Sequence, residues 1–176
     1  MAGRARRLVR PARLRNSLGI PSDYGARRGL KPQREASRLV SAGRDTDGRP
    51  LRLAPRAAAA WNAMRSAAAR DGLVLLGVSG HRGVARQAEI IRTKLASGQK
   101  MGEILRWVAA PGYSQHHTGR AIDIGSPGET DLAGSFGRTP EFRWLRRRAG
   151  EFGFRMSYPR GNGHGFAYEP WHWFIS

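Results

Sequence analysis

Two histidines and two carboxylates in the C-terminal part of the chain have the residue types needed to hold a metal ion and hydrolyse a bond. His116 and Asp123 belong to one segment, and Glu169 and His172 belong to a second segment near the end of the chain. Two histidines and one carboxylate would make a three-ligand zinc site with a fourth position for water, which is the composition of a catalytic site. A second carboxylate beside the ion could take a proton from that water and return it to a leaving amine.

The local sequence suggests how these side chains are positioned. Residues 119–124 alternate as a strand, so that Asp123 projects from one face while Ile122 points into the core. His116 lies on the preceding loop. In the second segment Pro170 prevents a helix and favours an extended chain, which lets its two neighbours Glu169 and His172 approach one site.

A purely structural interpretation competes with the metal site. A single histidine is more often a surface or hydrogen-bonded core residue than a metal ligand. A tryptophan-rich terminal strand such as residues 168–175 is more often part of the core than of a binding site. From spacing alone the two interpretations are about equally supported.

The wider pattern of apolar residues predicts an α+β fold. Helices and strands are both expected, but without the regular alternation of a parallel sheet. The predicted helices cover residues 55–70, 84–95 and 101–109 and begin again at 140, and the predicted strands cover 73–79, 119–124, 154–158 and 168–175.

Composition divides the chain into a basic arm and a domain. Residues 1–52 mix Arg, Gly, Pro and Ser without sustained periodicity and are predicted to be a flexible arm, followed by a domain over residues 53–176. The net charge of +18 favours a polyanionic partner but does not distinguish nucleic acid, anionic lipid and an acidic wall polymer, and it can equally reflect a GC-rich genome. The absence of cysteine excludes disulfides, a thiol nucleophile and a cysteine-ligated metal.

No targeting or membrane segment is expected from the sequence. The chain has no stretch of about 20 apolar residues. Its basic opening, residues 1–15, is not followed by the apolar run of a signal peptide.

The two candidate segments together resemble a known family. Ser114-x-His116-x-x-Gly119-x-Ala121-x-Asp123, followed by Glu169-x-Trp171-His172, is similar to the paired signature of the VanY-like D-alanyl-D-alanine carboxypeptidases. The resemblance covers about residues 50–176. Further blocks that match in order are Ser79–Arg82 with Gln87, Ala110–Ser114, Trp144–Leu145, Gly153–Phe154 and Ser157–Pro159.

The resemblance implies a fold, a cofactor and residue roles. The fold would be a small antiparallel sheet with helices packed against it, as in DD-peptidases and hedgehog-like zinc peptidases. His117 is one position off the pattern and is interpreted as a non-ligand. The implied roles are one zinc ion bound by His116, Asp123 and His172, general-base catalysis by Glu169, oxyanion or substrate binding by Arg82, and substrate binding by Gln87 and Ser114.

The implied function is hydrolysis of D-alanine-containing bonds in peptidoglycan stem peptides, in the periplasm or outside a bacterial cell. An endopeptidase of the same family and a catalytically silent wall-binding module are the alternatives, and retention of Glu169 argues against the silent module. The basic arm allows contact with anionic wall polymers or a membrane surface. A nucleic-acid partner is disfavoured because the sequence has no recognition helix, zinc-finger spacing or aromatic RNA motif.

Overall fold

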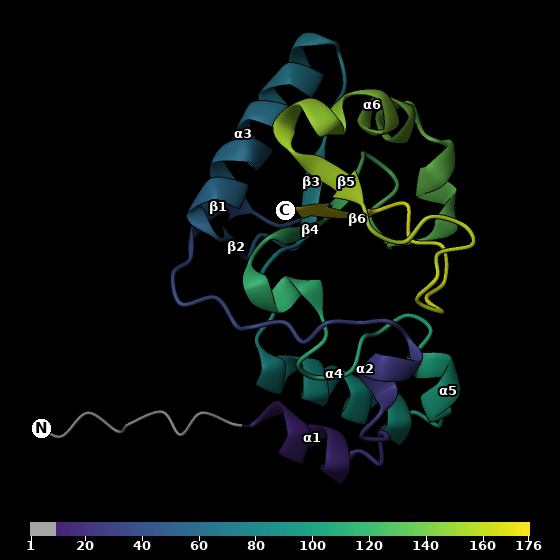
Figure 1. The fold of residues 1–176 in the computed structure, drawn as a ribbon. Coiled ribbons are helices and arrows are strands. Elements are labelled where there is room, and N and C mark those ends of the chain that lie inside the picture. The colour runs from purple at the N-terminus through teal and green to yellow at the C-terminus, as the bar shows by residue number, and fades with distance from the viewer. Residues whose placement is uncertain (1–9) are drawn as a thin grey trace, which may run out of the picture.

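The structure is a computed structural model that describes residues 10–176, and its centre is a small antiparallel sheet (Figure 1). The strand order is β3-β4-β6-β5, and every neighbouring pair is antiparallel. The strands are β3 (Leu76–Ser79), β4 (Ala121–Gly125), β5 (Phe154–Met156) and β6 (His172–Ile175). Together with the helices that pack around it, this sheet confirms the predicted α+β class.

One layer of helices covers the upper side of the sheet in Figure 1 and forms the larger core. It consists of α3 (Pro55–Arg70) and α6 (Pro140–Arg148). Proline stands at the start of both helices, where its missing N–H has no helical partner to lose. Trp61 and Met64 of α3 are fully buried with Ile122 of β4, as helical spacing on one side and strand alternation on the other require.

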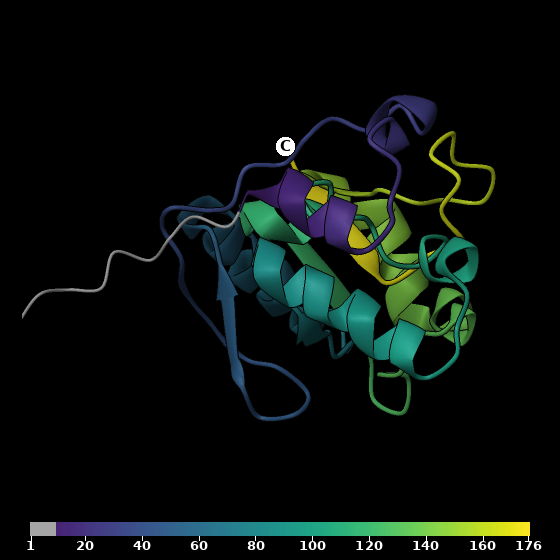
Figure 2. The ribbon, with the colours of Figure 1, turned by 90° about the horizontal axis from the view of Figure 1, so that it is seen from below.

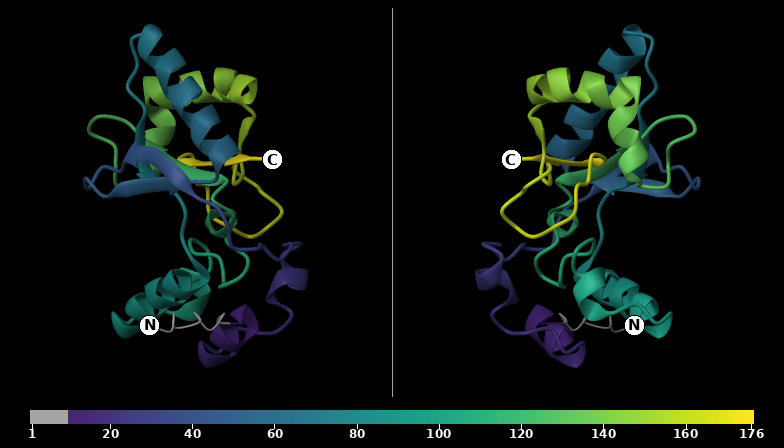
Figure 3. Two further views of the ribbon diagram at one scale, coloured as in Figure 1. Left: turned by 90° about the vertical axis from the view of Figure 1, so that its left-hand side faces the viewer. Right: turned by 90° about the vertical axis from the view of Figure 1, so that its right-hand side faces the viewer.

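A second layer lies below the sheet and has a separate core (Figures 1 and 3). Its main helix is α4 (Val84–Ala96), joined by α1 (Pro11–Ser17), α2 (Tyr24–Arg27) and the short α5 (Met101–Ile104). Seen from below, α1 lies against α4 (Figure 2). The buried cluster of this layer includes Leu18, Ile20, Tyr24, Ile91 and Ile104.

The second layer differs from the predicted flexible arm. Residues 1–9 lie outside the described part of the chain, but residues 10–52 form α1, α2 and most of a hairpin, β1 (Val40–Arg44) with β2 (Pro50–Leu53). The proposed boundary after residue 52 therefore falls inside β2. These elements are short, and their buried side chains contact residues far along the chain, so no local periodicity marks them.

Boundaries elsewhere in the chain also differ from the sequence-based expectation. Strand 73–79 begins only at Leu76, helix 101–109 ends at Ile104, and strand 168–175 begins at His172. The last difference has a clear cause: a turn closes before β6, in which the N–H of His172 donates to the carbonyl of Glu169 at 3.1 Å.

Three 3-10 helices complete the described fold: η1 (Gln115–Thr118), η2 (Gly134–Arg138) and η3 (Ala149–Phe152). Within residues 10–176, no helix combines the length and the apolar character needed to cross a membrane.

Candidate metal centre

Three of the predicted side chains converge between the two layers. One ligand atom from each of His116, Asp123 and His172 lies within 4.8 Å of the other two, and all three residues are buried. Asp123 and His172 are direct partners across β4 and β6. His116 comes from η1, immediately before β4. The sheet register and one tight turn therefore bring together residues that are up to 56 positions apart in the sequence.

The hydrogen bonds of the two imidazoles leave one nitrogen of each ring without a proton. His116 Nδ1–H donates to the carbonyl oxygen of Gly80 at 2.6 Å, so its Nε2 carries the lone pair. His172 Nε2–H donates to Oε1 of Gln115 at 2.9 Å, so its Nδ1 carries the lone pair. These two free nitrogens face the Asp123 carboxylate at 3.3 Å and 3.0 Å.

Such an arrangement fits a bound cation. Two nitrogen lone pairs and a carboxylate repel one another unless a positive charge lies between them. Outer hydrogen bonds that fix the imidazole tautomer are typical of metal-ligating histidines. Burial acts to raise the pKa of Asp123, but the neighbouring His116 and His172 outweigh it and hold the pKa well below its usual range. Burial lowers the pKa of His172. An ionised aspartate and neutral imidazoles are the protonation states that metal binding requires.

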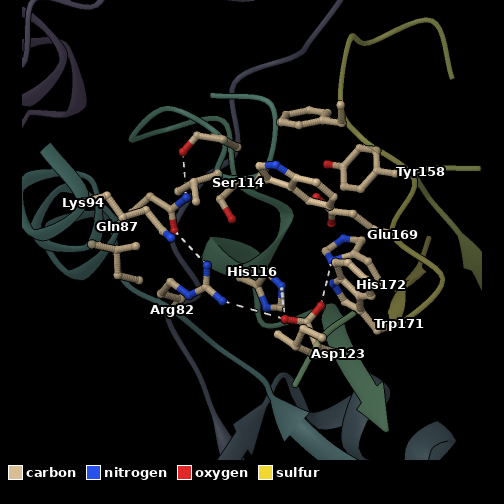
Figure 4. A pocket seen from close by; sticks show the side chains of 16 residues that line it. Arg82, Gln87, Lys94, Ser114, His116, Asp123, Tyr158, Glu169, Trp171 and His172 are labelled. Atoms are coloured by element: carbon tan, nitrogen blue, oxygen red, sulfur yellow. Dashed lines mark hydrogen bonds and ion pairs between the residues drawn. The ribbon is translucent and has the colours of Figure 1, made fainter. Parts of the chain in front are cut away.

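Glu169 lines the same cavity but is not a member of this cluster. Its side chain is buried, and its N–H donates to the carbonyl of Tyr158 at 3.0 Å, which fixes the turn before β6. Burial and the negative charge of Asp123 raise the pKa of Glu169 to about 9. Figure 4 places Glu169 on the His172 side of the cavity, where its carboxyl group can exchange a proton with a molecule bound there.

Arg82 forms the opposite side of the cluster and is held by its neighbours. Its guanidinium donates to Ser79 Oγ at 3.1 Å and to Gln87 Oε1 at 3.3 Å, and it lies 3.8 Å from Asp123 Oδ2. The amide nitrogen of Gln87 donates to the carbonyl of Ala109 at 2.6 Å. The oxygen and the nitrogen of the Gln87 amide are thus both hydrogen-bonded within the protein, and the bond to its oxygen helps to hold the Arg82 guanidinium in place. Ser114 is buried and also lines the cavity.

Two residues near the cluster were not given a role from the sequence. Gln115 orients His172, and its Oε1 also accepts a hydrogen bond from Ser157 Oγ at 2.6 Å. His117 lies outside the three-ligand cluster: its Nδ1–H donates to the carbonyl of Arg82 at 2.6 Å, and its Nε2 accepts from the N–H of Gly112 at 3.0 Å. Burial lowers the pKa of His117 to about 4. No local signal in the sequence reveals these contacts, because each depends on how η1 packs.

The cavity itself has a volume of about 350 Å³ and opens between the two layers. Trp107 stands at its rim with 52% of its surface exposed, stacked on Trp171 with ring centroids 6.2 Å apart. The side chains that face the cavity come from α4, η1, β4 and the segments that precede β6 (Figure 4). Its size and its mixture of apolar and polar side chains suit a short peptide segment.

Comparison with known sequences adds independent information. The family model VanY, described as D-alanyl-D-alanine carboxypeptidase, matches residues 50–175. The putative carboxypeptidase YodJ of Bacillus subtilis is 36% identical over 120 residues, which cover 66% of this chain and 43% of that protein. A D-alanyl-D-alanine carboxypeptidase of Enterococcus faecalis is 34% identical over 117 residues, covering 61% and 42%. The chain thus spans less than half the length of these curated relatives.

Solved structures show the same fold. The LD-carboxypeptidase LdcB superposes with a TM-score of 0.72 at 32% identity, covering 80% of this chain and 69% of that one. VanYB in complex with D-Ala-D-Ala has a TM-score of 0.65 at 28% identity, covering 83% and 81%. A vancomycin-resistance D,D-pentapeptidase VanY mutant in complex with Zn(II) has a TM-score of 0.63 at 28% identity, covering 83% and 82%.

Proposed function

The chain belongs to the VanY family of D-alanyl-D-alanine carboxypeptidases, and we propose that it is a zinc-dependent carboxypeptidase that releases C-terminal D-alanine from peptidoglycan stem peptides. The observation that carries this proposal is the convergence of two imidazoles and one carboxylate in a buried cluster, with the buried Glu169 lining the same cavity. The relatives solved with D-Ala-D-Ala and with Zn(II) support the same substrate and metal. Because the proposed substrate belongs to the cell wall, the enzyme would act outside the cytoplasmic membrane.

In this proposal His116 Nε2, Asp123 and His172 Nδ1 hold the zinc ion. When bound there, zinc would polarise the scissile carbonyl and lower the pKa of a water molecule toward about 7. Gly80 O accepts from His116, and Gln115 Oε1 accepts from His172. These two hydrogen bonds keep each ring in the tautomer whose other nitrogen can bind the metal.

Two further residues carry the proton and the developing charge. Glu169 accepts the proton of the attacking water and passes it to the nitrogen of the departing D-alanine. For the first transfer Glu169 must be ionised, and a cation held by the neighbouring ligands would offset the burial and the charge of Asp123 that raise its pKa in the metal-free protein. The Arg82 guanidinium donates to the carbonyl oxygen as that oxygen becomes negative, and its contacts with Ser79 and Gln87 hold it in place.

Three variants test these roles with two measurements, bound metal and release of D-alanine from a pentapeptide stem. Glu169→Ala is expected to keep its zinc and to lose turnover by about 100-fold or more. His116→Ala and His172→Ala are expected to lose both metal and activity. His164→Ala is the matched control, since His164 is not among the residues that line the cavity.

Product analysis separates the proposal from its alternatives. Incubation of wild-type protein with tetrapeptide and pentapeptide stems, with and without a chelator, distinguishes DD-cleavage, LD-cleavage and cleavage inside the stem. A protein that binds zinc but releases no amino acid or peptide would support a silent wall-binding module. A Glu169→Ala variant with undiminished activity would contradict the assigned role of Glu169.

A further inference from the structure

A groove of about 610 Å³ lies in the second layer and shares no lining residue with the catalytic cavity. It is bordered by α1, by the segment that leads from α2 to β1, by the start of α4 and by the turn before η1. In Figure 1 the segment between α2 and β1 runs above α1. Most of the lining lies between residues 10 and 35, before the family match that begins at residue 50. Its apolar part includes Pro11, Pro32, Val84 and Tyr113.

The groove carries an excess of positive charge. Its lining contains one acidic residue, Glu35, whose Oε2 accepts the N–H of Val84 at 3.0 Å and so satisfies the first turn of α4. None of the ion pairs within residues 10–176 involves an arginine of the groove. Residues 1–9 contain three arginines and no acidic residue, so they cannot supply a counter-charge. The arginines of the groove are Arg10, Arg15 and Arg34.

Arg15 is held in the wall of the groove by contacts that leave its charge uncompensated. Its Nη1 donates to the carbonyl of Pro111 at 2.9 Å, and its guanidinium carbon lies 5.0 Å from the centre of the Tyr113 ring. The residue is partly buried, and its Nε is buried without a hydrogen-bond partner among the described residues. Arg27 of the same layer, by contrast, pairs with Asp23 at 2.6 Å. Because a partly buried cation is unfavourable unless an anion compensates it, the groove has the character of an anion-binding site.

We infer that this groove binds a short acidic peptide segment with apolar side chains, supplied by another polypeptide. Carboxylates complement the arginines in charge, and a guanidinium can bind a carboxylate through two parallel hydrogen bonds. The apolar part of the lining favours a peptide over a phosphodiester polymer, because a partner recognised by charge alone would leave that part uncovered. The volume of the groove is that of a pocket which encloses a ligand of a few residues. Since the groove and the catalytic cavity have separate linings, this inference does not depend on the proposed function.

Fluorescence anisotropy with the full chain tests this inference. The probe is a labelled peptide in which glutamate alternates with leucine, and the same peptide with glutamine in place of glutamate is the uncharged comparison. Arg15→Met is expected to weaken binding of the acidic peptide by about 10-fold or more, because a charge-assisted hydrogen bond is lost. The double variant Arg10→Gln/Arg34→Gln changes two exposed side chains and should weaken binding by about 3- to 10-fold. Arg13→Gln is the matched control and should change Kd by less than about 2-fold, since Arg13 is exposed on α1 but does not line the groove.

Two further measurements separate recognition from a loss of structure. Urea unfolding shows whether Arg15→Met has lost its fold together with its contact to Pro111, and in that case the double variant decides the test. Release of D-alanine from a short stem peptide should be unchanged in the double variant.

The inference has outcomes that would overturn it whatever the fate of the proposed function. These are the absence of saturable binding, equal binding of the acidic and glutamine peptides, and equal weakening in Arg13→Gln. Polyphosphate that displaces the probe at a lower concentration than the unlabelled acidic peptide does would overturn it in favour of a phosphate polymer.

Discussion

The metal centre depends, at the scale of single residues, on which nitrogen of each imidazole carries a proton. His116 is fixed by a backbone carbonyl, which no substitution at Gly80 can remove, whereas His172 is fixed by the side chain of Gln115. Gln115 in turn is held by Ser157 from the strand side of the site. Gln115 therefore acts through His172 and is a positioning residue.

Replacing Gln115 should weaken metal binding without unfolding the protein. In Gln115→Leu the Nε2–H of His172 loses its acceptor, so the ring is free to adopt the other tautomer or rotate. Loss of such an outer partner typically costs about 10- to 100-fold in metal affinity. Competition with a chromogenic chelator measures this directly. Gln115→Glu, which keeps an acceptor, should retain the affinity, and the exposed Gln99→Leu is the control; a Gln115→Leu affinity equal to wild type would contradict the role.

Glu169 makes a second prediction, which concerns stability and pH in the metal-free protein. Its pKa rises from 4.5 to about 9 on folding, so the folded state keeps this proton to higher pH than the unfolded state does. The resulting stabilisation is fully present below about pH 4.5 and is lost as the pH rises toward 9, by at most about 1.4 kcal/mol per pH unit. Urea unfolding in the presence of a chelator should show wild type losing stability relative to Glu169→Gln between about pH 5 and about pH 8. Parallel stability curves would show that the carboxyl group ionises normally.

Residue types and spacing indicated the four central side chains as candidates, and the family resemblance implied their roles, but neither indicated the residues that support them. His116, Asp123, Glu169 and His172 lie together in one cavity, as expected from a strand, a tight turn and a proline. The role of Gln115 requires a contact across 57 positions, and that of Gln87 requires knowing that both ends of its amide are occupied. Neither contact leaves a periodic trace in the sequence.

At the scale of elements, η1 connects the proposed ligand His116 to three other parts of the fold. The carbonyl of His116 accepts the N–H of Arg82 at 3.1 Å, which ties η1 to the loop after β3. The carbonyl of Gly119 accepts the N–H of Ala54 at 2.8 Å, which ties its end to the start of α3. β4 begins two residues later, so the placement of η1 also sets the position of Asp123.

Gly119 is the residue that lets this turn close, and its replacement tests the element. Its φ is +66°, and an added Cβ would lie 2.8 Å from both the backbone nitrogen of Ala54 and Cδ2 of Leu39. Gly119→Ala should lower the free energy of unfolding by about 1–3 kcal/mol and weaken metal binding, because His116 moves with the turn. Gly128→Ala is the matched control: its φ is +81° but nothing lies within 4 Å of the added atom, so only backbone strain remains. Equal losses in both variants would show that the packing of η1 is not important.

Long helices were predictable at this scale, and short elements were not. The ranges of α3 and α4 agree with the sequence pattern because each repeats its apolar residues over several turns. Helix α2 has only four residues and α1 only seven, too few for a period to be recognised. For this reason the sequence pattern predicted a flexible arm where the structure has α1, α2 and β1.

At the scale of the whole molecule, the cavity lies between two hydrophobic cores, and the second core depends on residues that precede the family match at residues 50–175. Leu18, Ile20 and Tyr24 pack against α5 and against α4, and another face of α4 lines the cavity. Arg28 links this segment to the opposite side by donating to Leu105 O at 2.7 Å and to Gly165 O at 3.0 Å. The N-terminal segment thus packs against the helix that forms one wall of the cavity.

Ile20→Ala tests whether this segment is part of the cooperative fold. Ile20 is 3% exposed, so truncation leaves a cavity next to α4 and should lower the free energy of unfolding by about 2–5 kcal/mol in urea. Val74→Ala removes a similar amount of apolar side chain at a position that is 50% exposed, and it should cost no more than about 0.5 kcal/mol. If residues 10–30 were a loosely attached arm, both variants would unfold at the wild-type urea concentration. A loss confined to Ile20→Ala, in a single transition with the rest of the domain, would mean that the wall carrying Gln87 and Lys94 owes its position to a segment outside the family match.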